Sequence, residues 1–436
     1  MAISRRSYAY PVKSISEAKV VLQPEFQPDL FDENHLYVVL DEVREQAYLH
    51  ELYFDLGYIQ NTKYFEVSSD YVKIIFSGHR GSGKSAELRR IEKELTHPER
   101  YFTIFIDLEQ EVEVGSFQYA DFFSLLIHKL IEKLTTLQNK GGYERLQKLA
   151  EKLMPGKTEK IVIDKDKSVS NLEAGAEAGF RLFGFGGKAS FKEVFSGENE
   201  TSVTIRKEIK QNTLSLINNF NAELVDIRIA LEDAGFGRDI LFIFDGSEKI
   251  RHEVYEDLFV KNGNIVSEIN LNMVIAVPII AHFQIEKAPY KFTNRYIVPM
   301  IKLENNNKAR ELMQRIIGKR VDTSIFIDEE ALDLCIDFSG GCIRQLFHVV
   351  YESLKKSLGQ KINRKHVEAA VSTLGKYLWE YLREDHFKAL KDSDYRPADD
   401  NIGELLYMLI LLKYNGRTEI NPLLKNYPDF KKWMEK

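Results

Sequence analysis

A glycine-rich run that ends in a lysine and a serine is the strongest chemical signal in this sequence. The run reads Gly78-His79-Arg80-Gly81-Ser82-Gly83-Lys84-Ser85, and Ala86 follows it. Glycines let a backbone curl so that its N–H groups face an anion, and a helix that starts behind such a loop adds its positive N-terminal end. All nine residues are therefore candidates for binding nucleotide phosphates. The alternative is a glycine-rich turn with an exposed lysine.

The last two residues of the run have more specific expected roles. In loops of this pattern the lysine reaches the β- and γ-phosphates, and the serine hydroxyl ligates Mg²⁺. Lys84 is thus also a candidate catalytic residue and Ser85 a candidate metal ligand. The pattern predicts that ATP and Mg²⁺ bind here.

A second protein ligand for the same Mg²⁺ is expected at the end of a buried strand. Residues 240–244 form an apolar run, and Asp245 follows it, where a carboxylate is costly without a cation nearby. We predict that Asp245 holds Mg²⁺ through water, as a Walker B aspartate, and that Glu248 orients or deprotonates the attacking water. The alternatives are a helix cap for Asp245 and a solvated loop carboxylate for Glu248. Many efficient ATPases place a glutamate directly after the aspartate. Here that residue is Gly246, which predicts slow hydrolysis.

Hydrophobic patterning predicts the elements that position these groups. A β-rich run at 71–76 leads into the loop, and residues 85–95 have helical spacing. Further strands are expected at 102–106, 240–244, 272–277 and 296–301, with a long amphipathic helix at 117–137. Strands that alternate with helices predict an α/β fold with a parallel, doubly wound sheet.

The remaining segments predict additions to this core, which we place at 71–302. Residues 168–195 alternate with period two around Gly184, Gly186 and Gly187, so we expect a β-hairpin with a return strand at 188–194, inside an insertion over about 140–210. This hairpin either only packs on the core or forms a surface that docks a partner.

Helical segments are expected on both sides of the core. Residues 1–70 are predicted to be a leader and a helix, and 303–375 a helical lid. In the lid we expect one helix capped by Asp328 that ends at Ser339-Gly340-Gly341, and a second that begins near Cys342. Residues 376–436 are predicted to be a small helical or winged-helix-like domain, with helices at 378–390 and 403–412 and a turn at Asn415-Gly416.

Composition limits the class of protein. The formal net charge is −6, which argues against coating nucleic acid by bulk charge, although a local basic patch is compatible with it. Two cysteines suggest neither a disulfide framework nor a zinc site. The first ten residues lack the apolar core of a signal peptide, and we find no apolar stretch long enough for a transmembrane segment. A cytoplasmic location is predicted.

Over roughly residues 35–375 the chain resembles the AAA+ and STAND group of P-loop ATPases. The similarity is to the replication-initiator (origin-recognition) branch and to related bacterial ATP-binding proteins of defence systems. Three short motifs carry it: Val43-Arg44-Glu45, Asn294-Arg295 and Ser339-Gly340-Gly341-Cys342-Ile343-Arg344. The resemblance implies that Arg44 contacts the nucleotide base, that Arg295 is an arginine finger for a neighbouring subunit, and that Arg344 reaches the γ-phosphate from the lid. A surface role for Arg344 and a loop salt bridge for Arg295 are the alternatives.

The resemblance also implies a mode of action. It predicts an ATPase that forms homo-oligomers and switches a separate effector protein, for example in anti-phage defence. One departure favours an ATP-gated switch over rapid turnover: residues 275–280 read Ile-Ala-Val-Pro-Ile-Ile, without the polar sensor that the family has at the end of this strand. The alternatives are a DNA-associated initiator or loader, whose C-terminal segment binds duplex, and a scaffold that holds ATP without turnover.

Overall fold

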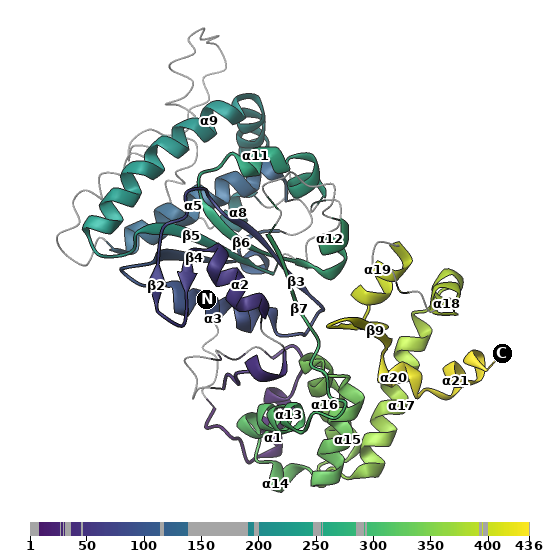
Figure 1. The fold of residues 1–436 in the computed structure, drawn as a ribbon. Helices are drawn as coiled ribbons and strands as arrows, with labels where there is room; N and C mark the ends of the chain where they lie inside the picture. Colours follow the sequence, from purple (N-terminus) through teal and green to yellow (C-terminus); the bar gives the residue numbers. More distant parts are fainter. Residues whose placement is uncertain are drawn as a thin grey trace.

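A five-stranded parallel sheet forms the centre of the computed structural model (Figure 1). The structure describes residues 8–26, 28, 30, 36–44, 47–113, 117–137, 191–195, 200–246, 254, 256–284, 292, 294–391, 395 and 400–435. The strands are β3 (Lys73–Gly78), β4 (Tyr101–Asp107), β5 (Asp239–Asp245), β6 (Asn272–Pro278) and β7 (Asn294–Val298). Their order across the sheet is β4-β5-β6-β3-β7, and every neighbouring pair is parallel. The predicted α/β parallel-sheet fold is confirmed.

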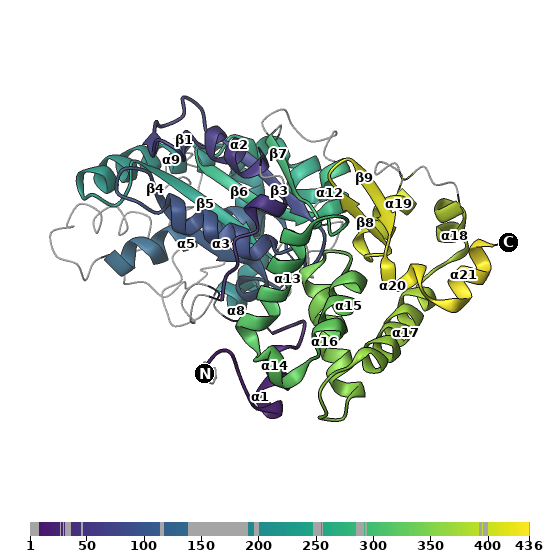
Figure 2. The same ribbon diagram turned by 60° about the horizontal axis from the view of Figure 1, so that its bottom comes forward.

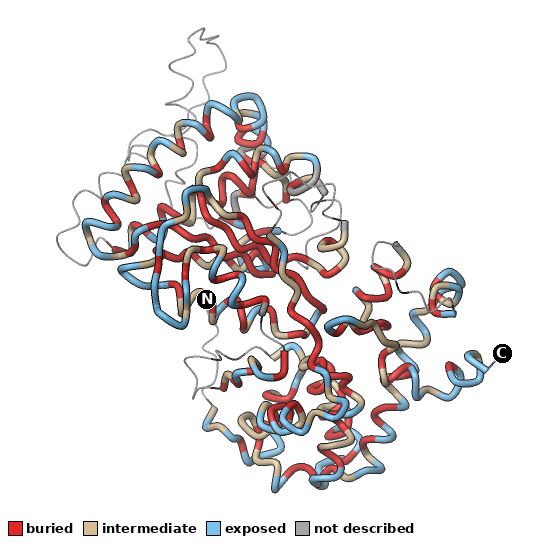
Figure 3. Tube along the Cα trace, viewed as in Figure 1, coloured by how far each residue is buried: buried red, intermediate tan, exposed pale blue. Residues whose placement is uncertain are grey.

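Helices cover both faces of the sheet. Strand side chains alternate between the faces, as in β5, where Phe242 and Phe244 point to one cluster and Leu241 and Ile243 to the other. The first face is packed by α5 (Tyr119–Leu137) and α9 (Glu200–Asp233), and the second by α2 (Ala47–Asp55) and α3 (Lys84–Leu95). Burial on both faces explains why these strands are almost continuously apolar. The strands are the most completely buried part of the chain (Figure 3).

Short elements complete the core. They are the hairpin β1 (Tyr58–Ile59) and β2 (Tyr64–Phe65), the helices α4 (Leu108–Glu111), α8 (Phe191–Phe195), α11 (Gly263–Ser267) and α12 (Ile279–Gln284), and a π-helical segment at Glu256–Lys261. Most of the predicted inserted hairpin lies outside the described residues. Its return strand at 188–194 is wrong where it can be compared, because residues 191–195 are helical. Phe191 and Phe195, one helical turn apart, stack with their ring centroids 4.4 Å apart and lie in the core beside α5.

A helical unit, for which we keep the name lid, follows the sheet. It consists of α13 (Asn307–Arg320), α14 (Thr323–Phe326), α15 (Glu329–Ser339), α16 (Ile343–Lys356) and α17 (Arg364–Glu380). The helices predicted to end at Ser339 and to begin near Cys342 are present as α15 and α16. The N-terminal segment, with α1 (Ile15–Val21) and a 3-10 turn at Asp41–Val43, packs into the core of this lid (Figure 2). Val12 forms a β-bridge with Val321, which fixes the segment to the end of α13.

The C-terminal unit combines helices with an antiparallel hairpin. Its elements are α18 (Glu384–Lys391), α19 (Asp400–Tyr407), β8 (Leu411–Tyr414), β9 (Arg417–Ile420), α20 (Pro422–Lys425) and α21 (Pro428–Met434). The predicted helix at 403–412 is wrong in its second half, because α19 ends at Tyr407 and the chain turns into β8. The predicted helix at 378–390 is interrupted between α17 and α18. Among the described residues no helix is long and apolar enough to cross a membrane.

Candidate functional site

The glycine-rich loop lies at the carboxyl end of the sheet, between β3 and α3. β3 ends at Gly78 and α3 begins at Lys84, so residues 79–83 form the turn between them. The Lys84 side chain is buried and folds back over this turn, where its Nζ donates hydrogen bonds to the carbonyl oxygens of Gly78 and His79, each 3.0 Å away. Strand, loop and helix occur in the order that phosphate binding requires.

A cavity of about 510 Å³ opens beside this loop. Its size is typical of ligand pockets, which hold ~300–1,000 Å³. The sheet side of its wall includes two strand-end carboxylates, Asp107 and Asp245. The loop side consists of Gly81, Gly83, Lys84, Ser85 and Ala86. Further residues of α3 and of the segment around Asp107 also line it, namely Arg89, Glu92, Lys93, Phe105 and Gln110. The lid and the N-terminal segment contribute Pro24, Phe26, Pro28, Leu30, Arg320, Ile343, Arg344 and Phe347.

The two carboxylates occupy equivalent ends of neighbouring strands. Asp107 of β4 and Asp245 of β5 are partners in the parallel register. Asp245 is 8 % exposed, and its Oδ1 accepts a hydrogen bond from the Gly246 N–H at 2.9 Å. Asp245 is predicted from the sequence as a site residue, whereas Asp107 is not. A signal for Asp107 is present in the sequence, because both apolar strands end in an aspartate.

The donor set of the cavity fits Mg²⁺ that arrives with a nucleotide. Mg²⁺ is commonly bound by one or two carboxylates together with phosphate oxygens and water. The exposed Ser85, at the start of α3, and the Asp245 carboxylate lie in the same cavity wall, as the sequence predicts. Within the described ranges no group of three or more His, Cys, Asp or Glu side chains could hold a metal ion by itself.

The start of lid helix α16 rests directly on the glycine-rich loop. The Arg344 backbone N–H donates a hydrogen bond to the Gly81 carbonyl at 3.1 Å. Gly81 has φ +77°, and a Cβ at this position would lie 2.1 Å from the Cβ of Arg344. Only glycine permits this approach. Arg344 also lines the cavity, which is the location that the resemblance implies for it, whereas its contact with a γ-phosphate stays a prediction.

Arg44 is buried behind the loop. Its Nη1 donates to Glu87 Oε1 at 2.8 Å, and its Nη2 donates to the Ser82 carbonyl. Both side chains of the Arg44–Glu87 pair are 1 % exposed. Arg44 thus connects the loop backbone to α3 and does not line the cavity. The base contact predicted for it would require this buried pair to open.

Two other candidate residues, Arg80 and Arg295, lie away from the cavity wall. Arg80 is exposed, with its guanidinium 6.0 Å from the ring centroid of Tyr407. Arg295 is also exposed and lies within β7, in register with Ile75, rather than just before the strand as predicted. It does not line this chain's own cavity, and its role as a finger stays a prediction. Glu248 lies outside the described residues.

His79 points out of the loop into the C-terminal unit. Its ring is fully buried, with Nδ1 3.0 Å from the Leu406 carbonyl and Nε2 2.8 Å from the Lys413 N–H. Since Lys413 N–H is a donor, Nε2 must accept, and Nδ1 carries the proton that it donates to Leu406. The neutral imidazole therefore ties the glycine-rich loop to α19 and β8, which its assignment as a nucleotide-binding residue does not anticipate.

This burial predicts a pH dependence of stability. Desolvation lowers the pKa of His79 to about 3, from an ordinary value of 6.5, because the neutral ring alone satisfies its contacts. The unfolded chain then binds the proton first, so the stabilisation is fully present above pH 6.5 and is lost as the pH falls from 6.5 through about 3, by up to about 1.4 kcal/mol per pH unit. Urea unfolding at pH 7.5, 6 and 5 measures this slope.

The control is His79→Gln, which keeps one donor and one acceptor without a titratable ring. We expect a shallower slope for this variant than for the wild type. Equal slopes in the two proteins would show that His79 does not carry the effect.

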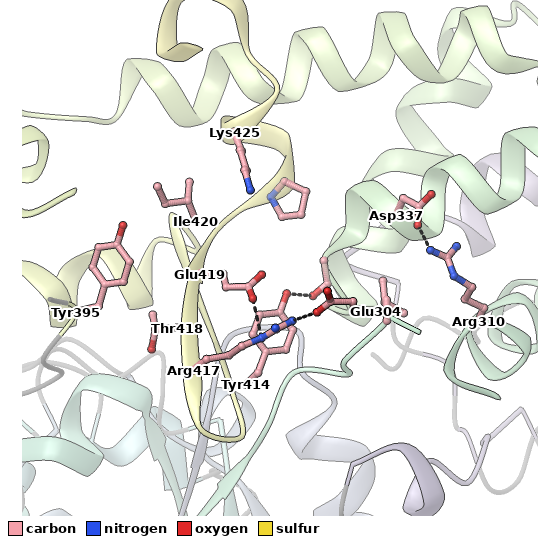
Figure 4. A pocket seen from close by; sticks show the side chains of 13 residues that line it. Glu304, Arg310, Asp337, Tyr395, Tyr414, Arg417, Thr418, Glu419, Ile420 and Lys425 are labelled. Atoms are coloured by element: carbon pink, nitrogen blue, oxygen red, sulfur yellow. Dashed lines mark hydrogen bonds and ion pairs between the residues drawn. The ribbon is translucent and has the colours of Figure 1, made fainter. Parts of the chain in front are cut away.

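A second cavity, of about 660 Å³, lies between the lid and the β8–β9 hairpin (Figure 4). Arg417 lies between two carboxylates, with Nη2 2.9 Å from Glu304 and Nε 2.6 Å from Glu419. Arg310 pairs with Asp337 in the same wall. Lys425 lines the cavity as well, so three cationic side chains balance three carboxylates, and the cavity is better described as a polar interface between two units than as a ligand site.

The chain is similar in fold to solved structures, one of which is described below. No protein-family model matches the chain, and no curated protein matches it. Among solved structures the chain is similar to the Walker-type ATPase of Pyrococcus abyssi, with 14 % sequence identity, coverage of 90 % of this chain and 98 % of that one, and a TM-score of 0.40. A similarity of this size does not by itself support an inference about activity.

Proposed function

We propose that the chain binds ATP with Mg²⁺ in the cavity beside the glycine-rich loop and hydrolyses it slowly, as an ATPase of the AAA+ and STAND type. The observation that carries the proposal is the contact of the loop with the lid, through Arg344 N–H and the Gly81 carbonyl. A ligand in this cavity touches both units at once. ATP binding can therefore shift the equilibrium between different positions of the lid relative to the core.

Different sides of the cavity suit the phosphates, the Mg²⁺ and the base of a nucleotide. The loop N–H groups and the Lys84 ammonium bind the phosphates, and Ser85 and Asp245 hold Mg²⁺, which neutralises charge on the phosphates. The base lies on the lid side, against the half-buried Phe26, since aromatic faces stack on bases. Arg320 supports this wall with its guanidinium 4.0 Å from the Phe347 ring centroid.

We further propose that the ATPase is a homo-oligomeric switch for a separate effector protein, with anti-phage defence as one setting. ATP can move an open–closed equilibrium only by its preference for the closed state. Arg295, exposed on edge strand β7, is available to a neighbouring copy as an arginine finger. Turnover per subunit would then rise with protein concentration, and turnover independent of concentration would contradict this assembly.

The DNA-associated initiator is the second candidate, and the C-terminal hairpin argues against it. β8 is bonded inward, to His79 through the Lys413 N–H and to Gly340 through the Tyr414 hydroxyl. Arg417, a basic residue of the hairpin, pairs with Glu304 and Glu419. A hairpin held in this way has little charge to offer to phosphates.

The switch is tested through Arg344. We expect Arg344→Ala to leave the fold intact and to reduce the protection from hydrogen exchange that ATP gives to residues 328–358, because a charged contact between lid and nucleotide is lost. Arg364→Ala, an exposed arginine on α17 away from the cavity, is the control. Identical ATP-dependent protection in wild type and Arg344→Ala would refute the lid's role.

A further inference from the structure

The residue after Asp245 has a backbone that disfavours any side chain, including the glutamate that many efficient ATPases have there. Gly246 has φ +78°, which L side chains rarely adopt. A Cβ at this position would also lie 3.0 Å from Oδ1 of Asp107. The space that a side chain at position 246 would enter is thus bordered by a carboxylate from the neighbouring strand.

Asp107 is held in a fixed orientation toward this space. Its Oδ1 accepts from the Glu109 N–H at 3.1 Å, and its Oδ2 accepts from Gln110 Nε2 at 2.7 Å. An ionised carboxylate has about four acceptor positions, so further ones are open to water. Asp107 lines the same cavity as Lys84 and Ser85 and lies in register with Asp245.

The geometry points to Asp107 as the catalytic carboxylate that orients the attacking water and accepts its proton, in place of a glutamate after Asp245. This inference rests on the proposed ATPase function and names a further residue for it. The water oxygen forms a bond to the γ-phosphorus, while the bond from that phosphorus to the β–γ bridging oxygen breaks. ADP leaves with the electron pair, the hydroxyl stays on phosphate, and the proton passes from Asp107 to solvent.

A purely structural role is the alternative, because Asp107 also caps the four-residue helix α4. Asp107→Asn separates the two roles. Asparagine caps helices as well as aspartate does, and the Gln110 amide can turn to accept from the new amide group. The variant therefore keeps the cap and removes only the carboxylate.

The chain offers a matched control in Asp322. It caps the four-residue helix α14 and accepts from the Ser324 N–H at 3.2 Å, as Asp107 does from Glu109. It lies in the lid, outside the cavity wall. Asp322→Asn is expected to have wild-type turnover and nucleotide affinity.

The experiment measures turnover, ATP affinity by calorimetry, and the identity of the nucleotide that stays bound after desalting. For Asp107→Asn we expect kcat to fall by about 100-fold or more, the usual contribution of a general base. We also expect unchanged affinity and melting temperature, and bound ATP where the wild type carries ADP.

The possible outcomes separate the two claims. Wild-type turnover in Asp107→Asn overturns the inference alone, as does a loss of turnover that is accompanied by an equal loss of ATP affinity. A wild type that binds ATP but never hydrolyses it also overturns the inference and leaves ATP binding in place. A wild type that does not bind ATP overturns the proposed function itself.

Discussion

Replacing Lys84 with alanine is expected to weaken ATP binding by about 2–4 kcal/mol, which is roughly 30- to 1,000-fold in Kd. The Lys84 ammonium lies over the loop, on the carbonyls of Gly78 and His79, in the wall of the cavity. Its removal deletes a charge-assisted partner for the β- and γ-phosphates in a water-poor site. Titration calorimetry with ATP and Mg²⁺ measures the change.

Lys376→Ala provides the control for Lys84→Ala. Lys376 is an exposed lysine on α17 that pairs only loosely with Glu380, at 3.6 Å. Its removal changes the net charge by the same amount without touching the cavity. If Lys84→Ala binds ATP as tightly as this control, the loop is not the nucleotide site.

Arg44→Met is expected to lower the free energy of unfolding by about 3–5 kcal/mol, because Glu87 would keep a buried charge without its cation. Both groups are 1 % exposed. The Tyr37 hydroxyl, 3.2 Å from each Glu87 oxygen, and Arg90, 3.7 Å from Oε2, compensate in part. We therefore expect a value in the lower half of the range. Urea denaturation of the protein without nucleotide measures it.

The double variant Arg44→Met with Glu87→Leu separates a support role from base recognition. With both charges gone, no buried carboxylate is left unpaired, so most of the lost stability should return. Base recognition by Arg44 predicts the opposite pattern, in which the single variant unfolds like wild type and ATP affinity falls. That result would show that Arg44 contacts the nucleotide and does not mainly stabilise the fold.

The sequence predicts the core of the fold because its local signals agree with its tertiary structure. The apolar runs that become β4, β5 and β6 are each bounded by polar or irregular residues, and they are predicted to within a residue or two at each end. The order of the strands is not a local property. The juxtaposition of Asp107 with Asp245, and hence the carboxylate pair of the candidate site, depends on that order and could not be read from either strand alone.

The wrong predictions arise where one local pattern fits two structures. The apolar residues of 403–412 have a spacing that suits a helix throughout. However, Asn415-Gly416 favours a tight turn, and the second half of this segment pairs as β8 with β9 instead. No local sequence pattern indicates the role of His79, since its partners Leu406 and Lys413 lie more than 300 residues further along the chain. Long-range hydrogen bonds of this kind are fixed by packing of whole units.

The order of strands in the sheet also determines when the loop can take its shape during synthesis. β3 pairs only with β6 and β7, so the strand that leads into the glycine-rich loop has no partner until residues 272–298 have been made. β4, the next strand along, pairs with β5 and does not contact β3 across the sheet. Pairing between such distant segments is slow, and it leaves apolar strands exposed meanwhile. A nascent chain that ends before β6 therefore carries the complete glycine-rich motif without either strand that pairs with β3, and we expect it to be a substrate for chaperones rather than a nucleotide-binding fragment.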